Sequence, residues 1–459
     1  MTEQNTLPNG WIEDKVKSIA LSIQYGYTQS SSKDPIGPRF LRITDIQEYK
    51  VNWEDVPYCA INDSEKGNYL LQDGDLVFAR TGATVGKSFL IKGNIPESIF
   101  ASYLIRLRFP NVINSKYIWY YFQSPFYWSQ IIDKQVGTGQ PNVNGTKLGQ
   151  LTVFIPPLAE QHRIVAKIEE LFSSLDNGIQ NLKTAQQQLK IYRQAVLKWA
   201  FEGKLTSVKN DNSQSQETND LPEGWKKETV KNIALNIQYG YTQSSSKEVV
   251  GPKFLRITDI QDYKVNWENM PYCQISDTEK QNYLLQDGDL VFARTGATVG
   301  KSFLIKGDIP ESIFASYLIR LRFPKTINDK YVWYYFQSPF YWSQIIDKQV
   351  GTGQPNVNGT KLGQLKIVIP PNIETQQAIV AEIESRLSVC DKLEETIQTS
   401  LKQSEILRQS ILKKAFSGQL VPQNPNDEPA SLLLEKIQGD RAKNNPKSPR
   451  KSRKKDNLS

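Results

Sequence analysis

The sequence predicts an α+β fold in which two near-identical globular heads are joined by two long antiparallel coiled-coil helices, with an approximate two-fold relation between the halves. Three observations carry this prediction. The stretch from Leu7 to Pro157 returns from Leu221 onward, and roughly 125 of the 151 aligned positions are identical, which indicates a duplicated domain. A long helical pattern follows each copy. A polar linker between the copies allows the second helix to run back along the first.

Each head shows a mixture of strand and helix patterns. LPNGW predicts a turn that places Trp11 in an anchoring pocket. Alternating or continuous apolar runs predict strands at 40–46, 75–79, 103–109 and 151–157. The aromatic stretch 116–134 predicts a buried helical region that restarts at Pro125. Since these elements lack a regular βαβ order, we expect a largely antiparallel sheet.

Two heptad patterns follow the heads. Apolar residues recur there at steps of three and four, as in a coiled-coil seam. The first set is Ile168, Leu171, Leu175, Leu182, Leu189, Tyr192 and Val196, and the second is Ile383, Leu387, Cys390, Leu393, Ile397, Leu401, Leu407 and Ile411. Gly203 and Gly418 end the patterns. About 46 residues give a helix of roughly 70 Å. This length and the polar flanks disfavour the alternative of a core helix inside a head.

The predicted domain boundaries follow from these patterns. They are a first head at 1–157, a helix at 158–205, a flexible linker at 206–220, a second head at 221–371, a helix at 372–420, a turn with a short helix at 421–440, and a disordered basic tail at 441–459.

Composition favours a cytoplasmic protein and leaves its ligand open. Three cysteines without paired spacing argue against a disulfide framework. The N-terminus lacks a signal sequence, and no apolar run is long enough to span a membrane. The net charge is +8, but the tail from Arg441 carries eight Lys and Arg against one acidic residue. The rest is therefore near neutral, and the tail is either a loose, salt-sensitive attraction for nucleic acid or a solvated terminus.

One motif resembles a nucleotide-binding loop but lacks a residue that such a loop requires. TGATVGKS at Thr81–Ser88 resembles a phosphate-binding P-loop, but the glycine that must stand five residues before the Gly-Lys pair is replaced by Thr81. The copy at Thr295–Ser302 has the same defect. The loop remains a candidate for holding a backbone phosphate through its N–H groups, Arg80 and Lys87, and the alternative is an ordinary hairpin turn.

Residues for catalysis are scarce. His162 is the only histidine, and its counterpart in the second copy is a glutamine. Neither head therefore offers a histidine base or a Cys/His metal cluster. Asp73 and Asp75 are better explained as turn residues, and neither an adenine-methyltransferase signature nor a dinucleotide fingerprint is present. We expect no metal, no cofactor and no catalysis by this chain alone.

Three polar, glycine-containing loops remain in each head: 24–33, 78–87 and 134–147. Their Gln, Asn, Thr, Arg and Lys side chains suit base edges and phosphates, although turns and glycan sites use the same types. The last two loops are unchanged between the copies, whereas the helices agree at roughly 19 of 48 positions. Either both heads bind the same ligand, or recombination recently copied one head over the other.

The combined motifs resemble a known family over nearly the whole chain. They are LPxGW, FARTGATVGK and NVNGTKLGQL in both heads, PPLAEQHRIVAKIEEL and PPNIETQQAIVAEIESRL at the helix starts, and RQAVLKWAFEGKL and RQSILKKAFSGQL at the helix ends. The chain resembles the specificity (S) subunit of a type I restriction-modification system.

The resemblance implies a non-catalytic DNA-recognition subunit. Its heads would be target recognition domains, each binding half of a bipartite site in double-stranded DNA. Its helices would set the half-site distance and dock two modification (M) subunits that bind S-adenosylmethionine, and restriction (R) subunits would complete the complex. Because the heads are nearly identical, we expect an interrupted palindrome. The alternative is a tandem glycan- or protein-binding module.

Within this reading, the three loops of each head supply the expected DNA contacts. Arg80, Lys87, Arg294 and Lys301 are the expected phosphate ligands, and the other expected contacts are Tyr27, Gln29, Lys33, Thr84, Gln140, Asn142 and Lys147 in the first head and Tyr241, Gln243, Lys247, Thr298, Gln354, Asn356 and Lys361 in the second.

Overall fold

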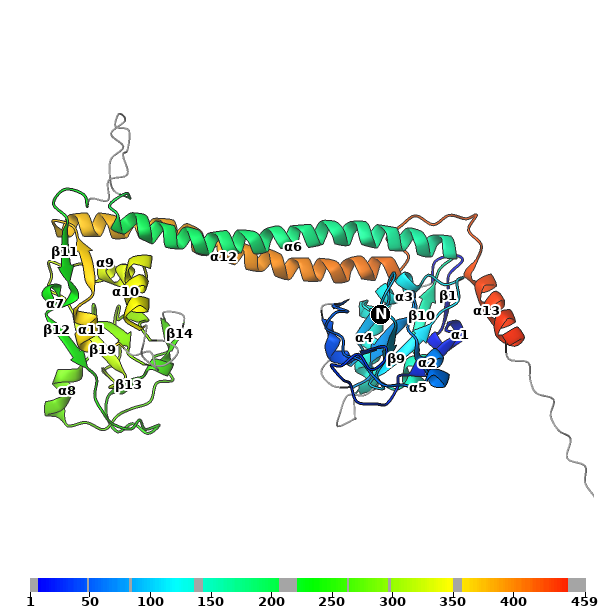
Figure 1. The fold of residues 1–459 in the computed structure, drawn as a ribbon. Coiled ribbons are helices and arrows are strands. Elements are labelled where there is room, and N and C mark those ends of the chain that lie inside the picture. Colours follow the sequence, from blue (N-terminus) through cyan, green and yellow to red (C-terminus); the bar gives the residue numbers. More distant parts are fainter. Residues whose placement is uncertain are drawn as a thin grey trace, which may run out of the picture. The chain divides into compact units, whose positions relative to one another are not determined.

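The computed structural model describes residues 7–47, 49–81, 85–135, 143–205, 221–261, 264–295, 299–349 and 357–444. The chain forms two compact units (Figure 1). Unit 1 contains residues 1–181 with 400–459, and unit 2 contains 182–399. Each unit therefore holds one head, the first part of the long helix that follows it, and the last part of the other long helix.

A four-stranded antiparallel sheet forms the centre of each head. In the first head its order is β2 (Ser22–Tyr25), β9 (Leu104–Arg108), β6 (Leu76–Ala79) and β7 (Ser88–Leu90). In the second it is β12 (Asn236–Tyr239), β19 (Leu318–Arg322), β16 (Leu290–Ala293) and β17 (Ser302–Leu304). The predicted strands at 75–79 and 103–109 and the antiparallel sheet are confirmed.

Short strand pairs surround this sheet. In the first head β1 (Ile12–Lys15) pairs antiparallel with β10 (Thr152–Ile155), β3 (Arg39–Leu41) pairs parallel with β8 (Ser98–Phe100), and β4 (Ile46–Gln47) pairs with β5 (Lys50–Val51). The second head repeats them as β11 (Lys226–Thr229) with β20 (Lys366–Ile369), β13 (Lys253–Leu255) with β18 (Ser312–Phe314), and β14 (Ile260–Gln261) with β15 (Lys264–Val265).

The prediction of one strand over 40–46 is wrong. A 3₁₀ turn at Ile43–Asp45 separates β3 from β4. Asp45 causes the break, since its carboxylate accepts the backbone N–H of Arg42 at 2.8 Å and pairs with the Arg42 guanidinium. A short acidic side chain that binds nearby backbone competes with a strand ladder.

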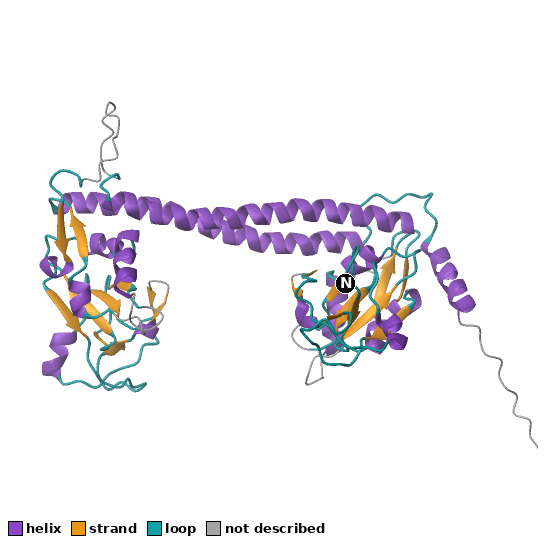
Figure 2. Cartoon of the chain, in the orientation of Figure 1, coloured by secondary structure: helices purple, strands orange, loops and turns teal. Residues whose placement is uncertain are grey.

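Short helices surround the strands of each head (Figure 2). The first head has α1 (Val16–Ile19), α2 (Asp63–Tyr69), α3 (Ser115–Tyr121), α4 (Pro125–Gln135) and α5 (Gly145–Gly149); the second has α7 (Val230–Ile233), α8 (Asp277–Tyr283), α9 (Asp329–Tyr335), α10 (Pro339–Gln349) and α11 (Gly359–Gly363). The predicted helical restart at Pro125 is confirmed. Tyr117, Tyr121 and Tyr127 are completely or almost completely buried in the main core of the first head.

The long helices are α6 (Leu158–Phe201) and α12 (Ile373–Phe416). Gly203 and Gly418 follow them with φ of +72° and +71°, as the sequence predicts for helix ends. The helices pack together in both units. Arg408 of α12 pairs with Asp176 of α6 in unit 1, and Arg193 of α6 pairs with Asp391 of α12 in unit 2. The predicted α+β class with two packed long helices is confirmed.

Some predicted seam residues lie outside the seam. Leu189 and Val196 are buried, but Tyr192 between them is exposed, as are Leu393 and Leu407. A straight α-helix has 3.6 residues per turn, so a pattern with a 3.5-residue period drifts off the contact face.

Unit 1 has an extra helix, α13 (Ala430–Asn444). Its Leu433 and Ile437 are buried in the core cluster that contains Trp11, and Arg163 of α6 holds the preceding loop through a 2.6 Å pair with Asp427. The helix continues four residues into the segment 441–459 that composition predicts to be disordered, because Arg, Ala and Lys extend a packed helix readily. The predicted linker 206–220 and residues 445–459 lie outside the described residues.

Candidate functional site

The motif TGATVGKS belongs to the hairpin between β6 and β7. Gly86 has φ of +84°, its N–H donates to the Ala79 carbonyl at 2.9 Å, and the Ala79 N–H donates to Lys87 at 2.9 Å. β7 begins at Ser88, where a P-loop requires a helix. The alternative of a hairpin turn is therefore correct, and residues 82–84 at its tip lie outside the described residues.

The three predicted loops meet at Tyr25. Tyr25 ends β2 and Arg80 follows β6, so both lie at the same end of the central sheet. The Arg80 guanidinium lies over the Tyr25 ring, 4.9 Å from its centroid. The third loop joins them, because the Gly145 N–H donates to the Tyr25 hydroxyl at 2.7 Å and the Val143 N–H donates to the Arg80 carbonyl at 3.0 Å. We call Tyr25, Arg80, Val143 and Gly145 the loop junction.

Arg80 has no carboxylate partner among the described residues, and its side chain makes little use of its hydrogen-bonding capacity. Its Nη1 donates to the Ser102 carbonyl over a long 3.4 Å, and its Nε is buried without a hydrogen-bond partner. Arg42, by contrast, pairs with Asp45, and Arg39 donates to two backbone carbonyls. The site therefore holds a partly buried positive charge whose hydrogen-bonding capacity is incompletely used.

The second head repeats the loop junction. Arg294 lies 5.0 Å from the Tyr239 ring centroid, the Gly359 N–H donates to the Tyr239 hydroxyl at 2.7 Å, and the Val357 N–H donates to Arg294 at 3.0 Å. Arg294 also has a buried, unpartnered Nε. The two heads thus present the same arrangement, including its unsatisfied donor.

The other predicted DNA contacts of the first head lie outside the loop junction. Gln29, Lys33 and Lys87 are exposed, and in the described chain no hydrogen bond or ion pair joins them to Arg80. Tyr27 packs its ring against Tyr69 at 5.1 Å, so it has a structural contact of its own. Lys147 lies in α5, next to the loop junction.

The second-head counterparts behave alike. Gln243, Lys247 and Lys301 are exposed, Tyr241 packs against Tyr283 at 5.1 Å, and Lys361 lies in α11. The predicted contacts Thr84, Gln140, Asn142, Thr298, Gln354 and Asn356 lie outside the described residues.

Sequence reasoning missed Tyr25. It selects Tyr27 in the first loop, whereas the structure places Tyr25 at the loop junction. Tyr103, in the turn before β9, accepts the Arg80 N–H on its carbonyl at 3.1 Å and leaves 62% of its surface exposed. Only the backbone carbonyl of Tyr103 takes part in this contact.

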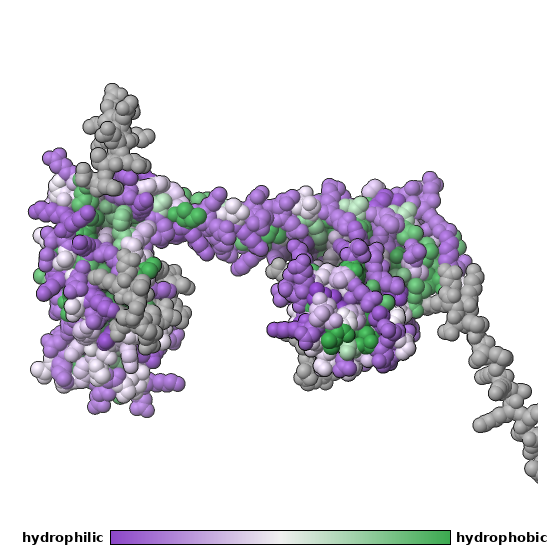
Figure 3. All heavy atoms as spheres, viewed as in Figure 1, coloured by the Kyte–Doolittle hydropathy of each residue, from purple (hydrophilic) through white to green (hydrophobic). Residues whose placement is uncertain are grey.

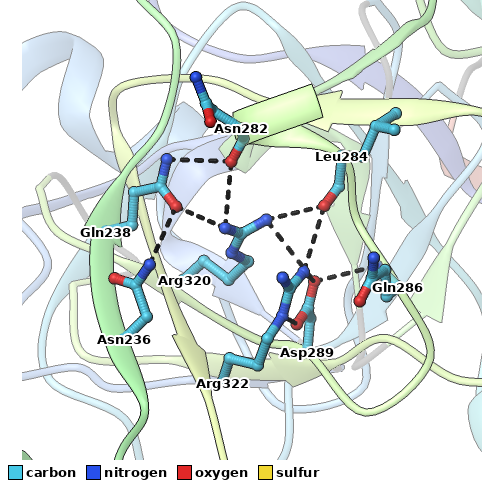
Figure 4. Close-up of polar contacts among 8 residues, drawn as sticks. All are labelled: Asn236, Gln238, Asn282, Leu284, Gln286, Asp289, Arg320 and Arg322. Carbon is cyan, nitrogen blue, oxygen red and sulfur yellow. Dashed lines mark hydrogen bonds and ion pairs between the residues drawn. The ribbon is translucent and has the colours of Figure 1, made fainter. Parts of the chain in front are cut away.

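A second arginine cluster is structural (Figure 4). In the second head Asp289 accepts two hydrogen bonds from Arg322 and lies 3.8 Å from the buried Arg320, which also donates to the carbonyls of Leu284 and Asn282. Burial lowers the pKa of Arg320, whereas the bond to Asp289 raises the pKa of Arg322. The first head repeats this cluster with Asp75, Arg106 and Arg108.

The charged groups of this cluster are paired with one another and with backbone carbonyls, so the cluster is not a candidate ligand site. Asp75 also accepts the Gln72 N–H at 2.9 Å, which confirms it as a turn residue. Arg106 has an unpartnered Nε like Arg80, but its terminal nitrogens donate to Leu70, Gln24 and Asn68. In the described ranges no group of three or more His, Cys, Asp or Glu side chains could hold a metal ion.

The loop junction offers the Tyr25 hydroxyl, the partly exposed Tyr25 ring and the Arg80 guanidinium. Such a surface suits phosphate groups and base edges. Within the part of the chain that the structure describes, none of the helices has the length and apolar character needed to cross a bilayer.

The chain matches known proteins over most of its length. The family model for the type I restriction modification DNA specificity domain matches residues 43–189 and 222–403. The chain is 29% identical over 461 residues to the EcoKI specificity subunit of Escherichia coli K12, covering 95% of this chain and 96% of that protein. It is 26% identical to the StySPI specificity subunit of Salmonella potsdam, with coverage of 95% and 96%.

Solved structures share the fold. A chain from a type I restriction-modification system studied for complex assembly and conformational transition superposes with a TM-score of 0.72 at 20% identity, covering 90% of this chain and 99% of that one. The specificity (HsdS) subunit of Thermoanaerobacter tengcongensis gives 0.59 at 21%, covering 91% and 100%. The chain therefore belongs to the family of type I restriction-modification specificity subunits, the DNA-specificity and non-catalytic members of these complexes.

Proposed function

We propose that each head binds one half of a bipartite site in double-stranded DNA, and that the two half-sites have the same sequence in inverted orientation around an unspecified spacer. The observation that carries this proposal is the repeated loop junction. Tyr25, Arg80 and Gly145 recur as Tyr239, Arg294 and Gly359 with distances that agree within 0.1 Å. Because the two loop junctions present the same groups in the same geometry, we expect them to bind the same ligand.

The inverted orientation is inferred from the long helices. Unit 1 pairs the start of α6 with the end of α12, and unit 2 pairs the start of α12 with the end of α6. Each unit is thus built on the same pair of antiparallel helices with their roles exchanged, which supports the proposal of inverted half-sites. Two identical DNA-binding domains related by a two-fold axis would recognise a palindromic site.

Two modification subunits are the proposed partners on the helices. Ile191 of α6 and Ile406 of α12 occupy equivalent positions and are 71% and 69% exposed. Exposed apolar side chains interrupt a mostly hydrophilic helix surface (Figure 3), as expected of a docking surface. Because the position recurs once per unit, it suits two copies of one partner. These subunits would supply S-adenosylmethionine and methyl transfer in the cytoplasm, and restriction subunits would add cleavage.

The binding test uses the complex with modification subunits and a duplex that contains the host's methylated motif. We expect Arg80→Ala and Arg294→Ala to weaken binding by equal factors, because each would remove the same contact from one half-site. Lys436→Ala, on α13, is the control and should bind normally. Failure of the wild-type complex to prefer this duplex over a scrambled one would overturn the proposal.

A further inference from the structure

We propose that Tyr25 and Arg80 form a clamp for a single DNA backbone phosphate in the first half-site, and that Tyr239 and Arg294 form the same clamp in the second. This inference rests on the proposed function and extends it to a specific ligand group. It adds Tyr25 and Tyr239, which the sequence does not single out, as phosphate-binding residues.

The hydroxyl of Tyr25 is oriented by the backbone. It accepts the Gly145 N–H at 2.7 Å, so a lone pair is occupied and its own proton remains to be donated. No acceptor for that proton is found among the described residues, and the side chain is 40% exposed. The hydroxyl is therefore a positioned donor on a partly exposed side chain.

The guanidinium of Arg80 lies over the ring of the same tyrosine, 4.9 Å from its centroid. Among the described residues, the long bond to the Ser102 carbonyl is the one hydrogen bond that its side chain donates. A buried polar atom without a partner, such as its Nε, is uncommon in native proteins and is often explained by an absent ion or ligand. The Nε of Arg294 is buried and unpartnered in the same way.

An anion with several oxygens satisfies both groups together. A phosphate can accept the Tyr25 hydroxyl on one oxygen and the Arg80 N–H groups on others, and guanidinium geometry suits that group. Among the described residues no carboxylate is paired with Arg80, and Asp75, at the opposite end of β6, is committed to Arg106 and Arg108. The chemistry therefore points to a phosphate supplied from outside.

Backbone hydrogen bonds hold Tyr25 and Arg80 in place, so the clamp would bind a phosphate at one position along the DNA. Arg80 is fixed by backbone bonds to Tyr103 and Val143, and Tyr25 is fixed by its strand pairing with Ile105. Such a clamp sets the register of the head on the duplex without reading a base.

The test is a double-mutant cycle between protein and DNA. Methylphosphonate replaces one phosphate at a time in the target duplex, and binding by the complex with modification subunits is measured by fluorescence anisotropy. For the wild-type protein, we expect one phosphate per half-site at which replacement weakens binding roughly 10- to 100-fold. At that position Tyr25→Phe and Arg80→Lys should cause little further loss, whereas each should weaken binding to the unmodified duplex.

The matched control is Tyr103→Phe, which removes a hydroxyl from an exposed tyrosine on the adjacent turn. It should leave the unmodified affinity and every methylphosphonate effect unchanged. Thermal unfolding of each variant checks the fold. If Tyr25→Phe disturbs α5, the scan with wild-type protein and Arg80→Lys still decides the matter.

The possible results distinguish a failure of the phosphate clamp from a failure of the proposed DNA recognition. Additive losses at every phosphate would overturn the clamp, while a preference for the target duplex would preserve the proposed function. Absence of that preference in the wild-type complex would overturn both. Sodium phosphate at matched ionic strength should compete no better than sodium chloride. Extra competition that Tyr25→Phe abolishes would assign the pair to free phosphate and overturn the DNA assignment.

Discussion

Phe201, the last residue of α6, packs edge-on against Tyr331 of the second head, with ring centroids 5.2 Å apart. In unit 1, Phe416 of α12 packs against Tyr117 of the first head at the same distance. Each head is therefore seated on the end of the helix that belongs to the other repeat. The two repeats depend on each other for stability, although each head has its own sheet.

Phe201→Ala should destabilise unit 2. Removal of a fully buried ring from a packed core costs about 3–5 kcal/mol, and Phe201 belongs to the main core cluster of the second head. Hydrogen exchange measured by mass spectrometry should show faster exchange in α9 and β20 than in α3 and β10.

Phe416→Ala is the matched variant and should give the reverse pattern, with the loss in the first head. Equal loss of protection in both heads from either variant would show that the heads do not depend on these contacts separately.

Asp75→Asn should be strongly destabilising. It removes the carboxylate that neutralises Arg106 and Arg108 and leaves buried positive charge, at a cost of about 3–5 kcal/mol. The measurement is the free energy of unfolding in urea. Asp63→Asn is the control, because the Asp63 side chain is 95% exposed where it pairs with Lys66 and contributes about 0–1 kcal/mol. Similar losses for both variants would refute the structural role of the cluster.

Gly418→Ala should cost more than Gly93→Ala. Both glycines have positive φ, +71° and +69°, so both substitutions carry a backbone penalty of about 1–2 kcal/mol. A Cβ at position 418 would also collide with the Pro8 ring, whereas position 93 has open space. The difference in the urea midpoint isolates the contact between the end of α12 and the start of the first head. Equal midpoints would indicate that Pro8 is free to move away.

Stability should fall at alkaline pH because of buried tyrosines. Burial raises the pKa of Tyr120 and of Tyr335 to about 12, against 10.0 for an unperturbed tyrosine. The unfolded chain therefore ionises first, so the contribution of each group is complete below pH 10 and is lost as the pH rises towards 12. The free energy of unfolding should decline there by up to about 1.4 kcal/mol per pH unit for each group. Tyr120→Phe should lessen the slope, and a flat profile would contradict this assignment.

Much of the fold was predictable because it follows from local patterns and repetition. Pro125 restarts a helix wherever it stands, Gly203 and Gly418 end helices through positive φ, and duplication predicts two equal heads. The drift that exposes Tyr192 and Leu407 could not be read from spacing alone, because it depends on how two helices wind against each other. The turn at Asp45 likewise depends on a side chain that binds backbone.

The candidate site was predicted at the level of loops and only partly at the level of residues. Arg80 was identified from its glycine-rich context. Tyr25 was missed, because its role depends on the approach of Gly145, which is 120 positions away along the chain. Sequence patterns contain no record of such a contact without the topology that brings β2 and α5 together.

The most direct test of the account is the methylation motif of the host genome, read by single-molecule sequencing in a strain that expresses this subunit as its sole specificity subunit with its modification subunits. The account predicts adenine methylation at an interrupted palindrome, with the same short half-site on both strands around an unspecified spacer. An asymmetric bipartite motif, with two different half-sites, would contradict it.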